Sequence, residues 1–115
     1  MRSLKTDLTT SQDLSSAALS YTTSYGRKFK LEQILFHSSV AISEQITITL
    51  DAKAGANYDT VLAGGINTLV SEQDWVFRPQ GEANFQAGDE IKIECTNANG
   101  KGIAYVTIKA REVLN

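Results

Sequence analysis

NFQAGDEIKIECTNANGKGIAYVTI, residues 84–108, contains two runs of alternating apolar and polar residues separated by a glycine-rich segment. In the first run Ile91, Ile93 and Cys95 occupy every second position, which is the spacing of one face of a β-strand. The residues between them are charged. This pattern predicts a half-buried strand over 89–96, with its apolar face toward a core and with Cys95 as a buried small hydrophobe.

The connecting segment NANGKG includes Asn99 and Gly100, a pair that favours the positive φ angles of a tight turn. The second run, 102–113, again carries apolar residues at alternate positions. The two runs and their turn therefore predict a hairpin that closes an antiparallel sheet.

Asp89 follows Gly88 at the start of the first strand. Its carboxylate could serve as a catalytic base or a metal ligand, or Asp89 could be a structural residue of the turn. Glycine supplies backbone conformations that other residues resist, and aspartate hydrogen-bonds to local backbone in turns. Its neighbour Glu90 points to the opposite face of the strand, so the two carboxylates cannot act as a pair. Gly88 and Asp89, like Asn99 and Gly100, are interpreted as structural turn residues.

The rest of the chain after residue 25 has the same β texture. No stretch of ten residues shows clean helical periodicity, and turn signals recur about every 10–12 residues. The run FKLEQILFH, residues 29–37, has large apolar residues at both odd and even positions, which predicts a bulge or a strand covered on two faces. We expect an all-β fold, a single antiparallel β-sandwich, with further strands in FKLEQILFH (29–37), EQITITLDA (44–52), DTVLAGG (59–65) and LVSEQDWVFRP (69–79).

Residues 1–24 differ in composition, because eleven of the 24 are Ser or Thr and apolar residues are sparse. These side chains compete with regular structure through local hydrogen bonds. The segment is either a frayed tail or an arm that orders against a neighbouring subunit. We divide the chain into an N-terminal arm, 1–24, and a sandwich domain, 25–115, with Leu4 and Leu8 as candidate subunit contacts.

The net charge of −2 and the dispersed basic residues give no electrostatic footprint for nucleic acid. The one basic cluster, RKFK, supplies Arg27, Lys28 and Lys30, which we interpret as a solvated strand edge or a subunit or capsid contact. Apolar runs fall far short of the roughly 18 residues of a membrane span, and the N-terminus lacks a secretory signal. Neither nucleic acid nor a membrane is expected as a partner.

Residues suited to catalysis or metal binding are few. His37 is the single histidine, and no nucleophile motif surrounds it. Asp51, Asn57 and Asp59 could offer oxygen ligands to calcium, but these residue types also build ordinary loops, and the usual calcium-loop spacing is absent. We expect no enzyme activity, no catalytic residues, no metal and no cofactor.

Trp75 and Phe77 share one face of a predicted strand. Exposed rings on a sandwich would favour carbohydrate binding, whereas a domain of 115 residues needs its large side chains in the core. Core packing is the favoured interpretation, with Trp75 kept as a possible aromatic contact.

The segments KLEQILFHSS, ITITLDAKAGANYDTVL, VFRPQGEANFQAGDEIKIECTN and GIAYVTI, in this order, resemble small virion proteins of tailed bacteriophages. The resemblance covers roughly residues 28–110. These virion proteins are similar to the jelly-roll decoration (cement) proteins of the capsid surface, and no catalytic residue carries over from them to this chain.

The resemblance implies a jelly-roll-like sandwich that stabilises a phage head by binding the major capsid protein and copies of itself, with a trimer favoured. The protein would be assembled in the host cytoplasm and reside on the virion. Two alternatives stay open. One is a carbohydrate- or receptor-binding module of a tail fibre or of a polysaccharide-active enzyme. The other is a head-tail connector, neck or tail-tube subunit.

Overall fold

The computed structural model describes residues 3–65, 68–81 and 83–114, which are almost entirely β-structure. No described helix is long and apolar enough to cross a membrane. The elements are β1 (Ser3–Asp13), β2 (Leu19–Ser24), β3 (Phe29–Ile42), β4 (Ile46–Asp51), the 3-10 turn η1 (Ala56–Tyr58), β5 (Thr60–Gly65), β6 (Glu72–Phe77), β7 (Asn84–Phe85), β8 (Glu90–Cys95) and β9 (Ile103–Val113).

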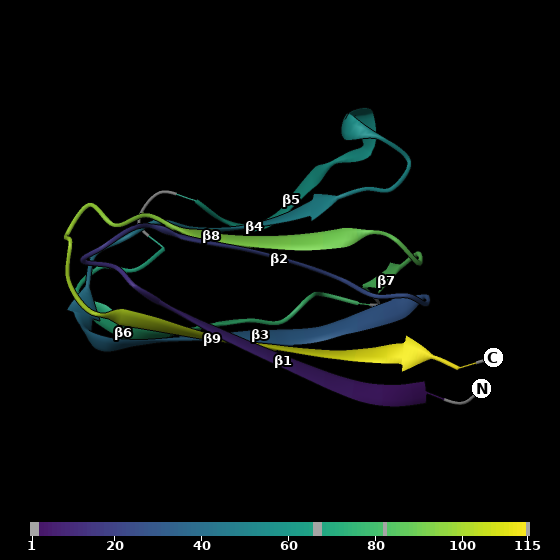
Figure 1. Ribbon diagram of the computed structural model, residues 1–115, viewed down its shortest axis with the longest axis horizontal. Coiled ribbons are helices and arrows are strands. Elements are labelled where there is room, and N and C mark those ends of the chain that lie inside the picture. The colour runs from purple at the N-terminus through teal and green to yellow at the C-terminus, as the bar shows by residue number, and fades with distance from the viewer. Residues whose placement is uncertain (1–2, 66–67, 82, 115) are drawn as a thin grey trace.

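The strands form two antiparallel sheets that face each other as two layers (Figure 1). One sheet has the order β1-β9-β3-β6, with β7 also paired to β3, and the other has the order β2-β8-β4-β5. Most connections cross from one sheet to the other, which is the wiring of a double-sheet jelly roll. The predicted all-β, jelly-roll-like sandwich is thus confirmed.

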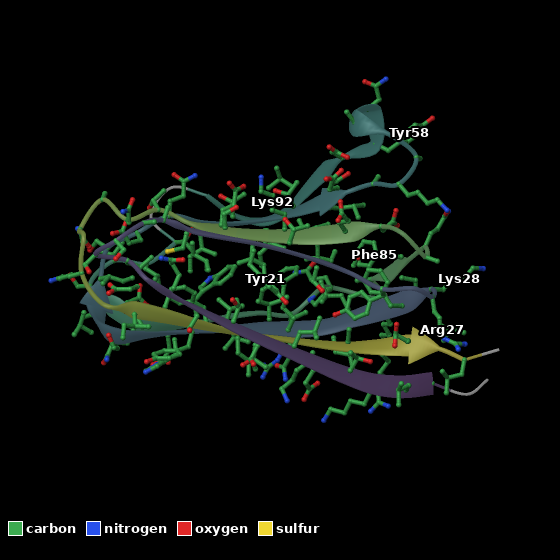
Figure 2. All side chains as sticks on the ribbon, viewed as in Figure 1. Tyr21, Arg27, Lys28, Tyr58, Phe85 and Lys92 are labelled. Carbon is green, nitrogen blue, oxygen red and sulfur yellow. The ribbon has the colours of Figure 1, made fainter. Side chains whose placement is uncertain are left out.

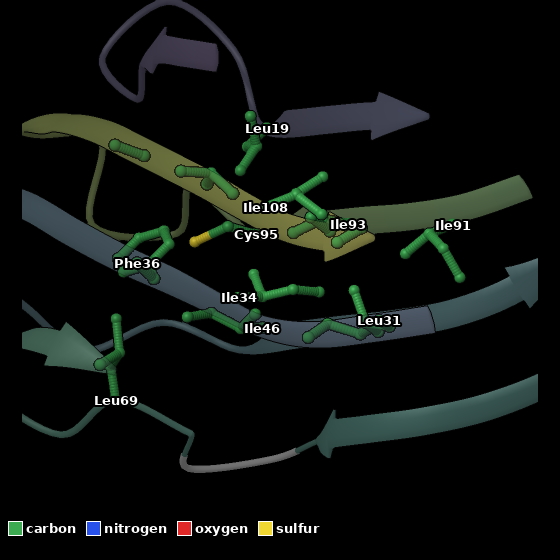
Figure 3. Packing of buried hydrophobic residues seen from close by; sticks show 14 of the residues in the cluster. Leu19, Leu31, Ile34, Phe36, Ile46, Leu69, Ile91, Ile93, Cys95 and Ile108 are labelled. Carbon is green, nitrogen blue, oxygen red and sulfur yellow. The ribbon is translucent and has the colours of Figure 1, made fainter. Parts of the chain in front are cut away.

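The core lies between the two sheets (Figure 3). The alternation seen in the sequence decides which side chains enter it: Ile91, Ile93 and Cys95 are buried, whereas the residues between them are not. Ile46 and Ile48 from β4 are buried in the same way. Removal of such groups from water is the main favourable term in the stability of the fold.

β3 carries the bulge that its mixed apolar pattern predicts. Its register against β9 shifts between Leu31 and Gln33. Leu31 is buried before the shift, and Ile34 and Phe36 are buried after it, so the inward side changes from odd to even positions. A bulge adds one residue to one strand and rotates the following side chains to the other face.

The N-terminal residues are not an arm outside the sandwich, and the boundary expected at residue 24 is wrong. Residues 3–13 are β1, which pairs with β9 over their whole length, and residues 19–24 are β2, which pairs with β8. Leu14 and Leu19 are buried. Threonine suits a strand whose surface is half exposed. In the edge strand β1 the neighbouring strand hydrogen-bonds the backbone, and every second side chain stays in water.

The hairpin predicted from residues 84–108 is also wrong, although both of its strands exist. β8 pairs with β2 and β4, whereas β9 pairs with β1 and β3. The segment between them crosses from one sheet to the other, with Gly100 at φ 61° and Gly102 at φ 86°. Asn99 does not have the positive φ of a two-residue hairpin turn. Local turn chemistry marks a reversal of the chain but does not say which sheet receives the next strand.

The β4–β5 hairpin projects away from the two layers, with η1 at its tip (Figure 1). Tyr58 and Val61 on this projection are both 65% exposed. Gly64 sits where β5 passes close to β4, at φ 99°, and a Cβ there would lie 1.9 Å from the carbonyl oxygen of Ile46. This close approach requires glycine.

Candidate interaction surfaces

Glu44 is a buried carboxylate, and its burial was not predicted from the sequence. The residue is 4% exposed. One oxygen accepts hydrogen bonds from the Thr96 hydroxyl at 2.7 Å and the Ala98 N–H at 2.9 Å, and the other accepts one from the Asn99 N–H at 2.7 Å. A buried carboxylate is tolerated when its oxygens are hydrogen-bonded. Glu44 therefore fastens the loop that crosses between β8 and β9.

The signal for this burial was present in the sequence. Glu44 shares even parity with Ile42 before it and with Ile46 and Ile48 after it, all three of which are buried. Its side chain is therefore directed to the interior of the sandwich, where the loop 96–99 supplies N–H and O–H donors.

Asp89 has a comparable structural role. Its Oδ1 accepts a hydrogen bond from the Lys53 N–H and its Oδ2 accepts one from the Gln86 N–H, both at 2.9 Å. The residue is 8% exposed. Gly88 beside it has a φ of 90°, which favours glycine. Both carboxylate oxygens thus bind backbone donors, and they join the turn before β8 to the loop after β4.

The groups that could perform catalysis do not converge. His37 lies on the outer face of β3, where its Nδ1 is 2.7 Å from the Asp74 carboxylate and its ring stacks on Tyr105. Cys95 is buried on the other sheet, and burial, with a smaller effect of Glu44, raises the pKa of its thiol to about 12. A thiol that stays protonated is a poor nucleophile. Within the described residues, no nucleophile contacts His37.

The loop considered for calcium holds no metal cluster. Asp59 uses Oδ1 to accept a hydrogen bond from the Ala52 N–H at 2.8 Å, which closes the β4–β5 hairpin. Asp51 ends β4, and Asn57 lies in η1. The described part of the chain contains no group of three or more His, Cys, Asp or Glu side chains that could hold a metal ion.

Trp75 does not form an exposed aromatic platform. It is half-buried on the inner side of β6, packs against the core and stacks on Phe77 with 6.4 Å between ring centroids. The exposed aromatic side chains are Tyr58 on the projecting hairpin and Tyr105 on the other sheet. Because these two come from different sheets, they do not make one continuous stripe.

A groove of about 650 Å³ opens near β6 and β7, where the two sheets separate. Leu31 and Leu62 reach it from opposite sheets, and the half-buried rings of Phe77 and Phe85 form part of its wall. Polar side chains stand among these apolar groups, namely Arg78, Gln80 and Asn84. Mixed apolar and polar lining is the usual composition of a small-molecule site.

Positive charge gathers at one end of the sandwich, in a group that we call the basic end. Lys5, Arg111 and Lys30 lie side by side across β1, β9 and β3. Arg27 and Lys28 lie in the turn that precedes β3, at the same end as the two termini (Figure 2). Arg27, Lys28 and Lys30 are close in the sequence, whereas Lys5 and Arg111 are distant from them and are brought beside Lys30 by the sheet register.

The basic end has few negative partners. Arg111 Nε lies 3.1 Å from the Glu32 carboxylate. In the described part of the chain, the other four cations have no ion-pair partner. Like charges opposite one another on neighbouring strands are destabilising, so a negatively charged partner would relieve a repulsion that the isolated chain retains.

Leu4 and Leu8, the two N-terminal contact candidates, lie on β1. Leu8 packs against the core, whereas Leu4 is 51% exposed. Both have even parity and so lie on the same side of the strand. The structure therefore brings Leu4, but not Leu8, to the surface as an apolar group without cover.

No known protein family matches the chain, and no curated protein matches its sequence. Solved structures do share its fold. The core of the Drosophila nucleoplasmin-like protein NLP, described for its pentamer formation and histone binding, aligns over 97% of this chain and 99% of its own, with a TM-score of 0.52 and 14% identity.

Two further structures align more weakly. The nucleoplasmin-like N-terminal domain of Drosophila FKBP39 has a TM-score of 0.48 and 10% identity over 96% of this chain and 92% of its own. A chain in the structure of infectious bursal disease virus, Gx strain, aligns with a TM-score of 0.45 and 13% identity over 96% of this chain and 31% of its own. The NLP likeness shows the fold.

Proposed function

We propose that this protein is a non-enzymatic structural component of a phage virion, a decoration protein that stabilises the head by binding the major capsid protein. The observation that carries the proposal is the basic end on a rigid sandwich. Arg27, Lys28 and Lys30 are exposed or half-exposed and lack carboxylate partners among the described residues. They suit an acidic patch on a shell subunit.

The sandwich body is consistent with this role. A shell component needs a compact fold and contacts that repeat over many copies, because repeated weak contacts give strong total binding. The NLP core, which shares the fold, is described as a pentamer, and self-association is part of the proposal. Nothing in the described residues favours the trimer that the resemblance implies.

Cosedimentation with capsid shells tests the proposal. The gene beside the one for this chain should encode a major capsid protein, and shells assembled from that protein should carry the chain to the pellet. The triple substitution R27E/K28E/K30E should abolish this binding. The control is K101E, which reverses one positive charge in the loop that crosses between β8 and β9, outside the basic end.

Two results would overturn the proposal: shells that do not bind the wild-type chain, or binding that the triple variant retains in full. Copy number separates the shell from the neck or tail. A few hundred copies per particle are expected for decoration, and about a dozen would favour the connector alternative.

The groove beside β6 favours a second candidate, a carbohydrate-binding module. Sugars present apolar faces to aromatic rings and hydroxyl groups to planar polar side chains. Phe77 and Phe85 could supply the rings, and Arg78 and Gln80 the polar groups. A glycan array should then detect binding that R78A removes, with Trp75→Ala affecting it less because Trp75 does not line the groove. An array without any bound glycan contradicts this candidate.

A further inference from the structure

The outer edge of β1 is an unprotected strand edge. β1 is the first strand of its sheet and pairs with β9 on one side only. The pairing runs without a register shift from Ser3 to Asp13. Natural edge strands are usually short, bulged or interrupted by proline, since unpaired N–H and C=O groups recruit another strand. β1 is long and regular, contains no proline and bears a single cation, Lys5.

The hydrogen-bond pattern shows which backbone groups are free. The Leu14 N–H donates to the Gly102 carbonyl at 2.9 Å, in the same register that pairs β1 with β9. Hydrogen-bonded and non-hydrogen-bonded pairs alternate along an antiparallel ladder. Even-numbered residues of β1 therefore bond to β9, whereas Lys5, Asp7 and Thr9 direct their N–H and C=O groups to the open edge.

The β9 side of the ladder agrees with this assignment. The Val113 N–H donates to the Lys28 carbonyl at 2.8 Å, on the side where β3 lies. Odd-numbered residues of β9 thus bond to β3 and even-numbered ones bond to β1. The open edge of β1 is not used by the strands that the structure describes.

We propose that this edge pairs with the same edge of a second copy, as an antiparallel two-fold dimer with its axis at Thr6. In this register Lys5 of one copy lies opposite Asp7 of the other, and this pair occurs twice. Leu4 lies opposite Leu8 of the other copy and becomes covered. The two sheets join into one continuous sheet through backbone hydrogen bonds. This contact deepens the self-association included in the proposed function.

Charge selects the register. Lys5 lies beside Arg111 and has no carboxylate partner among the described residues. The Thr6 axis supplies that partner in Asp7, whose carboxylate also lies 3.4 Å from Lys109 Nζ of its own chain, because opposite charges across strands attract. An axis at Asp7 would oppose two carboxylates, and an axis at Leu8 would place Lys5 opposite Ser11, leaving its charge unpaired. Leu4, which is 51% exposed, lies opposite another apolar side chain, Leu8, in the Thr6 register alone of these three.

Charge-swapped variants test the dimer by sedimentation equilibrium of the isolated protein. The wild type should be a dimer. K5D alone and D7K alone should each weaken dimerisation about tenfold or more, because each places like charges opposite one another twice. An equimolar mixture of K5D with D7K should recover dimers, since the mixed pair has opposite charges at both sites. The control K101E should behave as wild type.

Disulfide trapping tests the axis. Residues on the axis form a non-hydrogen-bonded pair with Cα atoms about 4.5 Å apart, within reach of a disulfide. T6C should therefore oxidise to a dimer, while T10C, whose two copies would lie roughly 27 Å apart, should not. The native Cys95 is buried and serves as an internal non-reacting thiol.

Four results would overturn the inference. They are a monomeric wild type, a trimeric wild type, a mixture of K5D with D7K that does not recover dimers, and T10C that cross-links as fast as T6C. These outcomes are separable from failure of the proposed function. Shell binding by a monomeric chain would sustain the decoration role while refuting the dimer, and a dimer that ignores shells would do the reverse.

Discussion

The Glu44 carboxylate accepts a 2.7 Å hydrogen bond from the backbone N–H of Asn99, a residue 55 positions later in the chain. The bond fixes the loop that carries the chain from one sheet to the other. Two more donors, from Thr96 and Ala98, reach the same carboxylate. A single acid thus holds the crossover on which the last strand of the jelly roll depends.

Glu44→Ala should strongly destabilise the fold. It removes the charged acceptor of three hydrogen bonds, two from backbone N–H groups and one from a hydroxyl, and we expect a loss of roughly 2–4 kcal/mol in the free energy of unfolding. Urea denaturation measures it. The control is Glu94→Ala on the exposed face of β8, for which a change within about 0.5 kcal/mol is expected. Equal effects of the two substitutions would contradict the anchoring role.

Asp89→Ala should destabilise for a related reason, by roughly 1–3 kcal/mol, because the N–H groups of Lys53 and Gln86 lose their acceptor. Thermal unfolding followed by circular dichroism measures the change. Asp51→Ala, which removes an exposed carboxylate at the end of β4, is the matched control. An unchanged melting temperature for Asp89→Ala would show that these two hydrogen bonds contribute little.

Gly64→Ala should be among the most damaging single substitutions. The added Cβ meets the Ile46 carbonyl at 1.9 Å, and the φ of 99° is unfavourable for alanine. We expect either loss of soluble protein or a fall of several kcal/mol, on the order of the strain at such positions. Gly26→Ala is the control, since nothing lies within 4 Å of a Cβ there. A Gly64→Ala protein as stable as wild type would refute the close approach of β4 and β5.

Tyr25→Phe should leave the fold intact or stabilise it by about 1 kcal/mol. The Tyr25 hydroxyl is buried and has no hydrogen-bond partner in the described part of the chain, so removing it relieves an unpaired polar group while the ring keeps its contact with Phe29, at 4.2 Å between centroids. Chemical denaturation at pH 7 measures the difference. A loss above about 1 kcal/mol would indicate that the hydroxyl has a partner.

Alkaline pH should destabilise the protein through Cys95 and Tyr25. Burial raises the pKa of the Cys95 thiol from 9.0 to about 12 and that of the Tyr25 hydroxyl from 10.0 to about 12. A raised pKa means that the folded state holds the proton more tightly than the unfolded state. The contribution of these two groups to the free energy of unfolding is therefore complete below about pH 9 and is lost as pH rises through about pH 12. Urea unfolding at pH 8, 10 and 11 should show the decline.

The double variant Cys95→Ala with Tyr25→Phe isolates the two groups. Its unfolding free energy should fall less steeply over the same pH interval. A decline as steep as that of the wild type would assign the alkaline effect to other groups.

Much of the fold could be predicted from local alternation. The pattern of Ile46 and Ile48 in one strand, and of Ile91 and Ile93 in another, follows from the two-residue repeat of a strand with one buried face. The mixed pattern of residues 29–37 predicted either a bulge or a strand covered on two faces, and β3 has the bulge. These features depend on neighbours in the sequence, and the sequence displays them directly.

The sites were less predictable, because they depend on partners that are distant in the chain. The burial of Glu44 was not predicted, although its even parity with Ile42 and Ile46 pointed to the interior. The RKFK part of the basic end was predicted, but the addition of Lys5 and Arg111 was missed, because these two are 106 positions apart and meet only through the register of β1 with β9.

What the sequence by itself determined is the longer strands after residue 25, their buried faces and the turn role of residues such as Gly88, since each rests on local sterics and spacing. What only the tertiary structure decided is which strands pair. The segment 3–13 became an edge strand, and β8 and β9 went to different sheets, because backbone hydrogen bonds are alike for every residue and only the packing of the whole core selects among pairings. The open edge of β1 and the basic end beside it follow from that choice.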